Sequence, residues 1–120
     1  MTQQSQAAQE VFDQLAAEQV RRPGVNRRRM FGRDGLNVEG KFFAFLDRDK
    51  LVLKLPAATA EGLIRAGEAS TTRKSPTMRR WVSVPMSSPT AAARRWRQLM
   101  ADAYAHVASP TQLWRIASGE

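Results

Sequence analysis

The stretch "LNVEGKFFAFLDRDKLVLKLP", residues 36–56, decides the fold class of this chain. Its runs "KFFAFLD" and "KLVLKLP" are apolar and of strand length, and the connections between runs are short enough for hairpins. In the last run Leu51, Leu53 and Leu55 alternate with Val52, so the leucines share one face of a strand. The stretch therefore predicts an antiparallel meander.

Helical periodicity flanks these strands on both sides. Residues 5–20 predict a first helix, Pro56 begins a second that ends at Gly67, and Ser88-Pro89 begin a third. The apolar residues that these helices direct at a core are Ala8, Val11, Phe12, Leu15, Ala16, Ala60, Leu63, Ile64, Trp96, Leu99, Met100, Ala103 and Val107. With "WVSVP" as a later strand, the order predicts an α+β fold. We expect a two-layer α/β sandwich, order α-β(3-4)-α-β(1-2)-α, with helices on one face of an antiparallel sheet.

The arginine-rich segment before the meander, "NRRRMFGRDG", predicts an extended run followed by a turn at "GRDG". In a strand, Arg27 and Arg29 share a face with Phe31, while Arg28 lies on the face of Met30. An arginine directed at the helices must reach an edge or meet an acid. The first helix offers three acids for this purpose, Glu10, Asp13 and Glu18.

The three phenylalanines of the meander have two possible roles. Alternation places Phe43 and Phe45 on one face of the strand and Phe42 on the other. Exposed aromatic residues on a sheet could stack nucleic-acid bases. Base-stacking sheets carry a glycine-flanked aromatic strand and a second aromatic strand, and this sequence has neither, so a role of the phenylalanines in core packing is favoured.

The positive charge is unevenly distributed along the chain. Thirteen of the nineteen Lys and Arg residues lie in two segments without acids, 21–33 and 69–101, and the formal net charge is +8. Such asymmetry favours an anionic partner. A compositional explanation stays open, because fifteen of the nineteen are arginine in an alanine-rich chain.

These segments supply the candidate contacts to nucleic acid or to another anion. They are Arg27, Arg28, Arg29, Arg33, Arg73, Lys74, Arg79 and Arg80. Arginine contacts to phosphate give affinity without base specificity.

Catalytic chemistry has little support in the sequence. The absence of cysteine excludes disulfides, thiolate catalysis and cysteine-based zinc sites. The single histidine, His106, is predicted to be a surface residue beside Asp102, because a metal centre needs several convergent ligands. We expect no enzyme activity, no cofactor and no metal site. No secretory signal or apolar run of membrane length is present, so a cytoplasmic location is expected.

Several short motifs together resemble the N-terminal domain of the TfoX/Sxy family of bacterial competence regulators. These motifs are Met30-Phe31-Gly32, Gly35, Gly40 with Phe43-Ala44, and Leu51-Val52-Leu53-Lys54, followed by "MRRWVSVP" and a terminal helix. The resemblance spans about residues 8–108. It implies a small regulatory domain with a fold similar to secretion chaperones, and no catalytic residues.

We therefore expect one domain over residues 1–120, with a core of about 8–108 and a C-terminal tail, 109–120. The leading hypothesis is a non-enzymatic regulatory domain that binds non-specific nucleic acid or an acidic protein. The alternative is a protein-interaction or homodimer module that uses an edge strand and the apolar tail residues Leu113, Trp114 and Ile116. No membrane partner is expected.

Overall fold

The computed structural model describes residues 3–30, 32–71 and 81–108. Its elements, in chain order, are α1 (Gln3–Gln19), β1 (Val25–Met30), β2 (Arg33–Val38), β3 (Lys41–Asp47), β4 (Lys50–Lys54), α2 (Ala57–Arg65), β5 (Ser70–Thr71), β6 (Trp81–Pro85) and α3 (Pro89–Val107). The predicted tail contacts lie outside the described residues. Within the described part of the chain, no helix is both long enough and apolar enough to span a bilayer.

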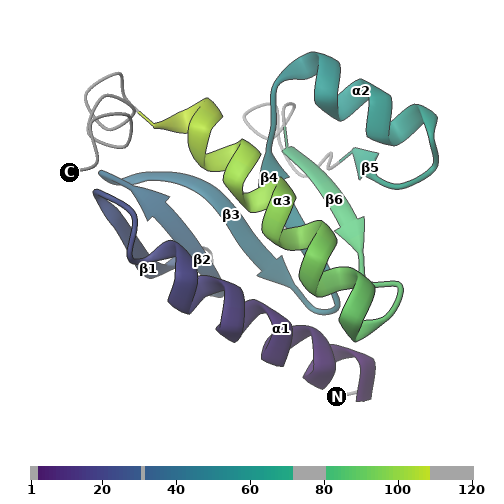
Figure 1. The fold of residues 1–120 in the computed structure, drawn as a ribbon, viewed down its shortest axis with the longest axis horizontal. Helices are drawn as coiled ribbons and strands as arrows, with labels where there is room; N and C mark the ends of the chain where they lie inside the picture. Colours follow the sequence, from purple (N-terminus) through teal and green to yellow (C-terminus); the bar gives the residue numbers. More distant parts are fainter. Residues whose placement is uncertain (1–2, 31, 72–80, 109–120) are drawn as a thin grey trace.

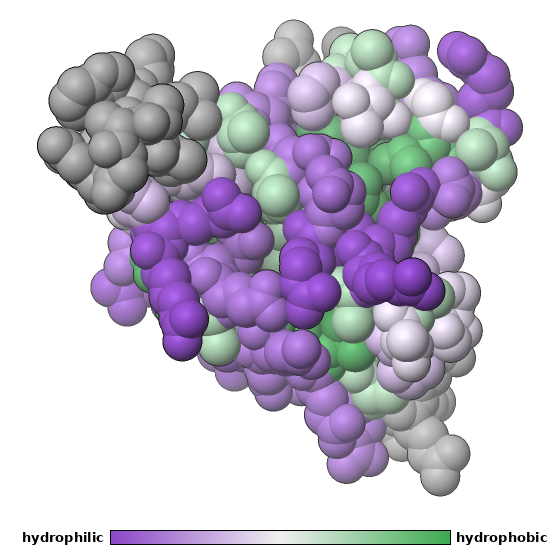
Figure 2. All heavy atoms as spheres, in the orientation of Figure 1, coloured by the Kyte–Doolittle hydropathy of each residue, from purple (hydrophilic) through white to green (hydrophobic). Residues whose placement is uncertain are grey.

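The strands form one antiparallel sheet in the order β1-β2-β3-β4-β6-β5. Helices α1 and α3 lie across one face of this sheet, and α2 lies at its far side next to β5 (Figure 1). The predicted α+β sandwich is confirmed. Figure 2, which looks onto the helical layer, shows hydrophilic residues over much of this face with smaller apolar patches between them.

The main core fills the space between the helices and the sheet. Its fully buried members with large side chains are Phe12, Leu15, Leu36, Val38, Phe43, Leu51, Leu53, Leu55, Trp96, Met100 and Tyr104. Helix α3 begins as predicted, because the Ser88 hydroxyl accepts a hydrogen bond from the Ala91 N–H and Pro89 follows at the first helical position. One predicted core residue is wrong: Ile64 of α2 is 37% exposed, because this short helix buries only Ala60 and Leu63.

A β-bulge separates two phenylalanines that strict alternation would place together. Leu36 pairs with Ala44 and Asn37 pairs with Phe42, so Phe43 is an extra residue in β3. Phe43 therefore faces the helices and packs edge-on against Tyr104, with ring centroids 5.9 Å apart.

Phe45 lies on the opposite face of the sheet, in a second buried cluster with Val52 and Trp81. Phe42 is partly buried and packs against this cluster. The prediction that Phe43 and Phe45 share a face is wrong because of the bulge, whereas their role in packing is confirmed.

The predicted turn at "GRDG" is correct at Gly32 and wrong at Gly35. Met30 pairs with Arg33, so the chain reverses between these two residues, and Gly32 has a φ of 77°. Gly35 lies inside β2 instead. A Cβ at this position would come within 3.0 Å of the Phe42 ring and 3.2 Å of the Arg28 carbonyl oxygen.

Replacing Gly35 with valine is therefore expected to lower the free energy of unfolding by roughly 1–3 kcal/mol, because the added atoms overpack the sheet against Phe42. Chemical denaturation measures the change. The matched control is Gly62→Ala in α2, where an added Cβ meets nothing within 4 Å. That variant should gain about 0.5–1 kcal/mol from helix propensity. Equal stability of Gly35→Val and wild type would contradict the close packing of β2 on Phe42.

Candidate anion-binding surface

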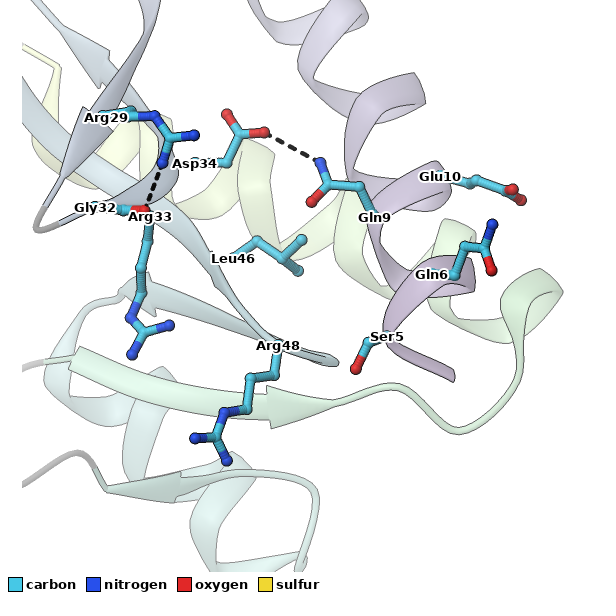
Figure 3. Close-up of a pocket in the computed structure, with 10 residues that line it drawn as sticks. All are labelled: Ser5, Gln6, Gln9, Glu10, Arg29, Gly32, Arg33, Asp34, Leu46 and Arg48. Carbon is cyan, nitrogen blue, oxygen red and sulfur yellow. Dashed lines mark hydrogen bonds between the residues drawn. The ribbon is translucent and has the colours of Figure 1, made fainter. Parts of the chain in front are cut away.

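Two hairpin turns and the start of α1 meet at one end of the sheet. In a meander the first and third connections lie at the same end, which places Gly32 beside residues 48–49. A cleft of about 760 Å³ lies here, between these turns and α1 (Figure 3). It is lined by Ser5, Gln6, Gln9, Glu10, Arg29, Gly32, Arg33, Asp34, Leu46 and Arg48.

Three arginines from three separate segments line this cleft. Arg29 comes from the end of β1, Arg33 from the start of β2 and Arg48 from the β3–β4 turn. We call them the hairpin-end arginines. In Figure 3 the side chains of Arg33 and Arg48 both point away from α1. The same two residues line a second cleft of about 290 Å³ with Asp47, Asp49 and Lys50.

The three hairpin-end arginines differ in the ion pairs and hydrogen bonds that their side chains form. Arg33 Nη1 lies 2.8 Å from Asp47 Oδ1, and both side chains are partly exposed. Arg29 Nη1 donates a hydrogen bond of 2.6 Å to the carbonyl oxygen of Gly32 (Figure 3). Neither Arg29 nor Arg48 forms an ion pair with an acid among the residues that the structure describes.

The backbone of Arg48 adopts an unusual conformation. Its φ is 61°, in the left-handed region that glycine and asparagine favour. A bulky residue in this region costs about 1 kcal/mol or more, and such strain is common at functional positions. The turn therefore carries an arginine at a conformational cost.

Arg27 has a structural role. Its Nε donates to Asp34 Oδ1 at 2.8 Å, and its Nη2 lies 2.5 Å from Asp13 Oδ1. The guanidinium also lies over the Phe12 ring, 5.5 Å from the centroid. Gln9 Nε2 donates to the second Asp34 oxygen at 3.1 Å. The expected pairing of an inward-facing arginine with an acid of the first helix is thus seen for Asp13.

The remaining candidate contacts are placed as follows. Arg28 is exposed on the sheet face away from the helices, since Arg27 faces α1 and side chains alternate along β1. Arg73, Lys74, Arg79 and Arg80 lie outside the described residues. Of the acids expected near the arginine run, Glu18 instead accepts two hydrogen bonds from Arg97 of α3, at 2.8 and 2.9 Å. Glu10 lines the cleft.

Arg48 was not among the contacts expected from sequence. It lies between Asp47 and Asp49, outside the two acid-free segments, and the acids on both sides hid it from a charge count. The signal was nevertheless present in the topology. A predicted meander places its first and third turns at one end, so a cation in the third turn belongs with those in the first.

The Arg27 guanidinium changes the titration of its main partner. Its hydrogen bond holds the pKa of Asp34 below the ordinary value of 3.8, against the opposite effect of partial burial. The folded state therefore binds this proton more weakly than the unfolded chain does. The resulting stabilisation is complete above the ordinary pKa and is lost as pH falls from there through the lowered pKa of the folded state.

Asp34→Asn is expected to remove this contribution. The wild type should be more stable than the variant at about pH 6, and the difference should shrink steadily below about pH 4 as Asp34 takes up its proton. Urea denaturation over a pH series measures both proteins. A stability difference that stays constant down to about pH 2 would show that the Arg27–Asp34 pair does not shift the carboxyl pKa.

In the described part of the chain, no group of three or more His, Asp or Glu residues is placed so that it could hold a metal ion. His106 is exposed on α3. Its neighbour Asp102 accepts a hydrogen bond of 3.2 Å from Gln98 Nε2.

Comparison with known proteins identifies the family. A search of curated proteins finds no match to this chain. The family model of the TfoX N-terminal domain matches residues 14–107, which contain all six strands, α2, α3 and the last turns of α1. The family is of a regulatory, non-catalytic type. The match covers most of the chain and agrees with the motifs seen in the sequence, and this chain therefore belongs to the TfoX N-terminal domain family.

Proposed function

We propose that this small regulatory domain binds nucleic acid through its phosphates, at the sheet end that carries the hairpin-end arginines. One observation carries the proposal: Arg29, Arg33 and Arg48 come from three segments and line a single cleft. The guanidinium group presents a fork of donors that matches phosphate oxygens. The formal net charge of +8 would steer a polyanion toward the protein.

The proposed binding is non-specific in base sequence. Helices α1 and α3 use their apolar stripes to cover the sheet, and α1 is tied to the sheet by the Asp13–Arg27 ion pair. Specific readout commonly places a helix or strand pair in the major groove with side chains at base edges. The hairpin-end arginines instead lie around a cleft at turns, which suits contacts to a phosphate backbone.

The backbone of Arg48 favours a functional origin over a purely compositional one. A bias toward arginine codons alone gives no reason for an arginine to occupy a strained position. Arg48 occupies a left-handed position at a cost, and it does so beside the other two cations of the cleft.

The test is the salt dependence of binding to a random-sequence DNA duplex, measured by fluorescence anisotropy. Three phosphate contacts predict a slope of about −2.7 in the plot of log affinity against log salt. The affinity should then fall roughly fortyfold between about 50 and 200 mM salt. No binding at the lower salt concentration would reject the proposal.

Arg48→Gly separates binding from folding. Glycine accepts the φ of 61° without strain, so the variant should be as stable as the wild type or more stable by up to about 1 kcal/mol. The loss of one contact should reduce the slope to about −1.8. The backbone control is Glu39→Gly, at φ 50° in the β2–β3 turn. That variant should keep the wild-type slope. An unchanged slope for Arg48→Gly would exclude Arg48 as a contact.

A further inference from the structure

Strand β1 forms an open edge of the sheet. It is the first strand in the sheet order, and among the described residues no strand pairs with its outer side. The strand is six residues long, and its central residues, 26–29, are all exposed. An edge of this length presents unpaired backbone groups that another extended chain could use.

The ladder with β2 shows which backbone groups are unpaired. The N–H of Glu39 donates to the carbonyl oxygen of Gly24 at 2.9 Å, which makes that pair a hydrogen-bonded one. Such pairs recur at every second residue of an antiparallel ladder, so Asn26 and Arg28 bond to β2. Arg27 and Arg29 consequently direct their N–H and C=O groups outward.

Val25 belongs with Arg27 and Arg29 to the residues whose backbone groups point away from β2, and its hydrogen bond supports this alternation. Its N–H turns away from β2 and donates to the carbonyl oxygen of Arg22 at 3.2 Å. The open part of the edge therefore begins after Val25. It offers two donors and two acceptors, at Arg27 and Arg29.

The positive charge of the β1 edge favours an acidic partner strand. Three consecutive arginines, 27–29, occupy the strand, and a second copy of β1 placed alongside would oppose them with like charges. Arg27 is neutralised by Asp13 and Asp34, but Arg28 has no ion pair with an acid in the described part of the chain. An acidic strand with its carboxylates on the face of Arg28 would pair with that side chain.

We propose that the β1 edge binds an extended acidic segment of a partner protein, which adds to the sheet as a seventh strand through the backbone groups of Arg27 and Arg29. This interaction uses the side of the sheet rather than the cleft at its turns. It does not depend on nucleic-acid binding.

The experiment uses the full chain and an eight-residue peptide of alternating glutamate and threonine. Hydrogen exchange of single amides is followed by NMR. At a peptide concentration about ten times the Kd, exchange at Arg27 and Arg29 should slow by about tenfold. The amide of Arg28 already bonds to β2, so its rate should change much less. A peptide of alternating lysine and threonine should not bind.

Two controls separate strand addition from charge attraction. The acidic peptide N-methylated at every residue keeps its charge but loses all its backbone donors, so it should neither bind tightly nor protect Arg27 and Arg29. Arg28→Glu should weaken the unmodified peptide by roughly three- to tenfold, as cross-strand charge pairs do. The same reversal at Lys41, on β3 and away from the edge, should have little effect.

Four outcomes would overturn the proposal. Equal binding of the N-methylated peptide would show that only surface charge is recognised. Protection of Arg27 and Arg29 without peptide, together with a doubled mass in solution, would make a second copy the occupant. No binding of the acidic peptide at millimolar concentration would leave the edge without this function. DNA that slows exchange at the same alternate amides would assign the edge to nucleic acid.

Discussion

Trp96→Ala is expected to lower the free energy of unfolding by about 3–5 kcal/mol. Trp96 of α3 is completely buried in the main core, where the helix crosses the sheet. Truncation removes its apolar surface from the core and leaves a cavity that the helices and sheet can only partly fill. A domain of this size is stable by about 5–15 kcal/mol, so the variant would lose a large part of its margin.

Urea denaturation of Trp96→Ala measures this loss. Leu99→Ala, one turn further along the same stripe, should cost about 2–5 kcal/mol. The control on the opposite side of α3 is Gln98→Ala, an exposed position that should change stability by less than about 0.5 kcal/mol. If Trp96→Ala and Gln98→Ala unfold at the same urea concentration, the apolar stripe of α3 does not form the core.

Reversing the three hairpin-end arginines should nearly abolish DNA binding. The triple variant Arg29→Glu, Arg33→Glu, Arg48→Glu removes the proposed phosphate contacts and places three carboxylates around the cleft. Hydrogen bonds to charged groups contribute about 1.5–3 kcal/mol each, so the loss of affinity should exceed about a hundredfold at low salt. Stability should fall by no more than about 1 kcal/mol, because the only ion pair lost among the described residues is the partly exposed Arg33–Asp47 pair.

The control for this variant has the same net charge. Arg21, Lys41 and Arg65 are exposed and lie away from the cleft, at the end of α1, at the start of β3 and on α2. Their reversal to glutamate should reduce the affinity far less than reversal of the hairpin-end arginines. Equal losses for both triple variants would mean that net charge alone attracts DNA. Anisotropy titrations at one salt concentration compare the two.

Local patterns in the sequence predicted the elements and most of the core. The alternation of Leu51, Leu53 and Leu55 identified the inner face of β4, and all three are fully buried. The cap at Ser88-Pro89 located the start of α3. Such features depend on residues a few positions apart, so periodicity and capping chemistry are enough to find them.

The errors came from contacts between segments. The bulge at Phe43 depends on how β3 pairs with β2, and simple alternation contains no information on pairing. Gly35 was assigned to a turn because of its residue type. Its actual role, to leave room for Phe42 on the next strand, requires knowledge of the register.

The candidate site was predictable only in part, for the same reason. The sequence identified Arg29 and Arg33 by charge, and the expected acid partner Asp13 does meet Arg27. Asp34 was missed as the closer partner because it was placed in a turn rather than on a strand facing α1. Arg48 was missed because its two neighbouring acids cancel its charge locally, and only the meander brings it beside the other two arginines.

The central claim is that the end of the sheet carrying the hairpin-end arginines contacts nucleic acid. An NMR titration of the full chain with a short DNA duplex tests it most directly. Backbone amide shifts should concentrate at Arg29, Gly32, Arg33 and Arg48. The β2–β3 turn at the opposite end of the same hairpins, residues 39–40, should not shift. Shifts at residues 39–40 with none at the four named amides, or no shifts at all at low salt, would contradict the claim.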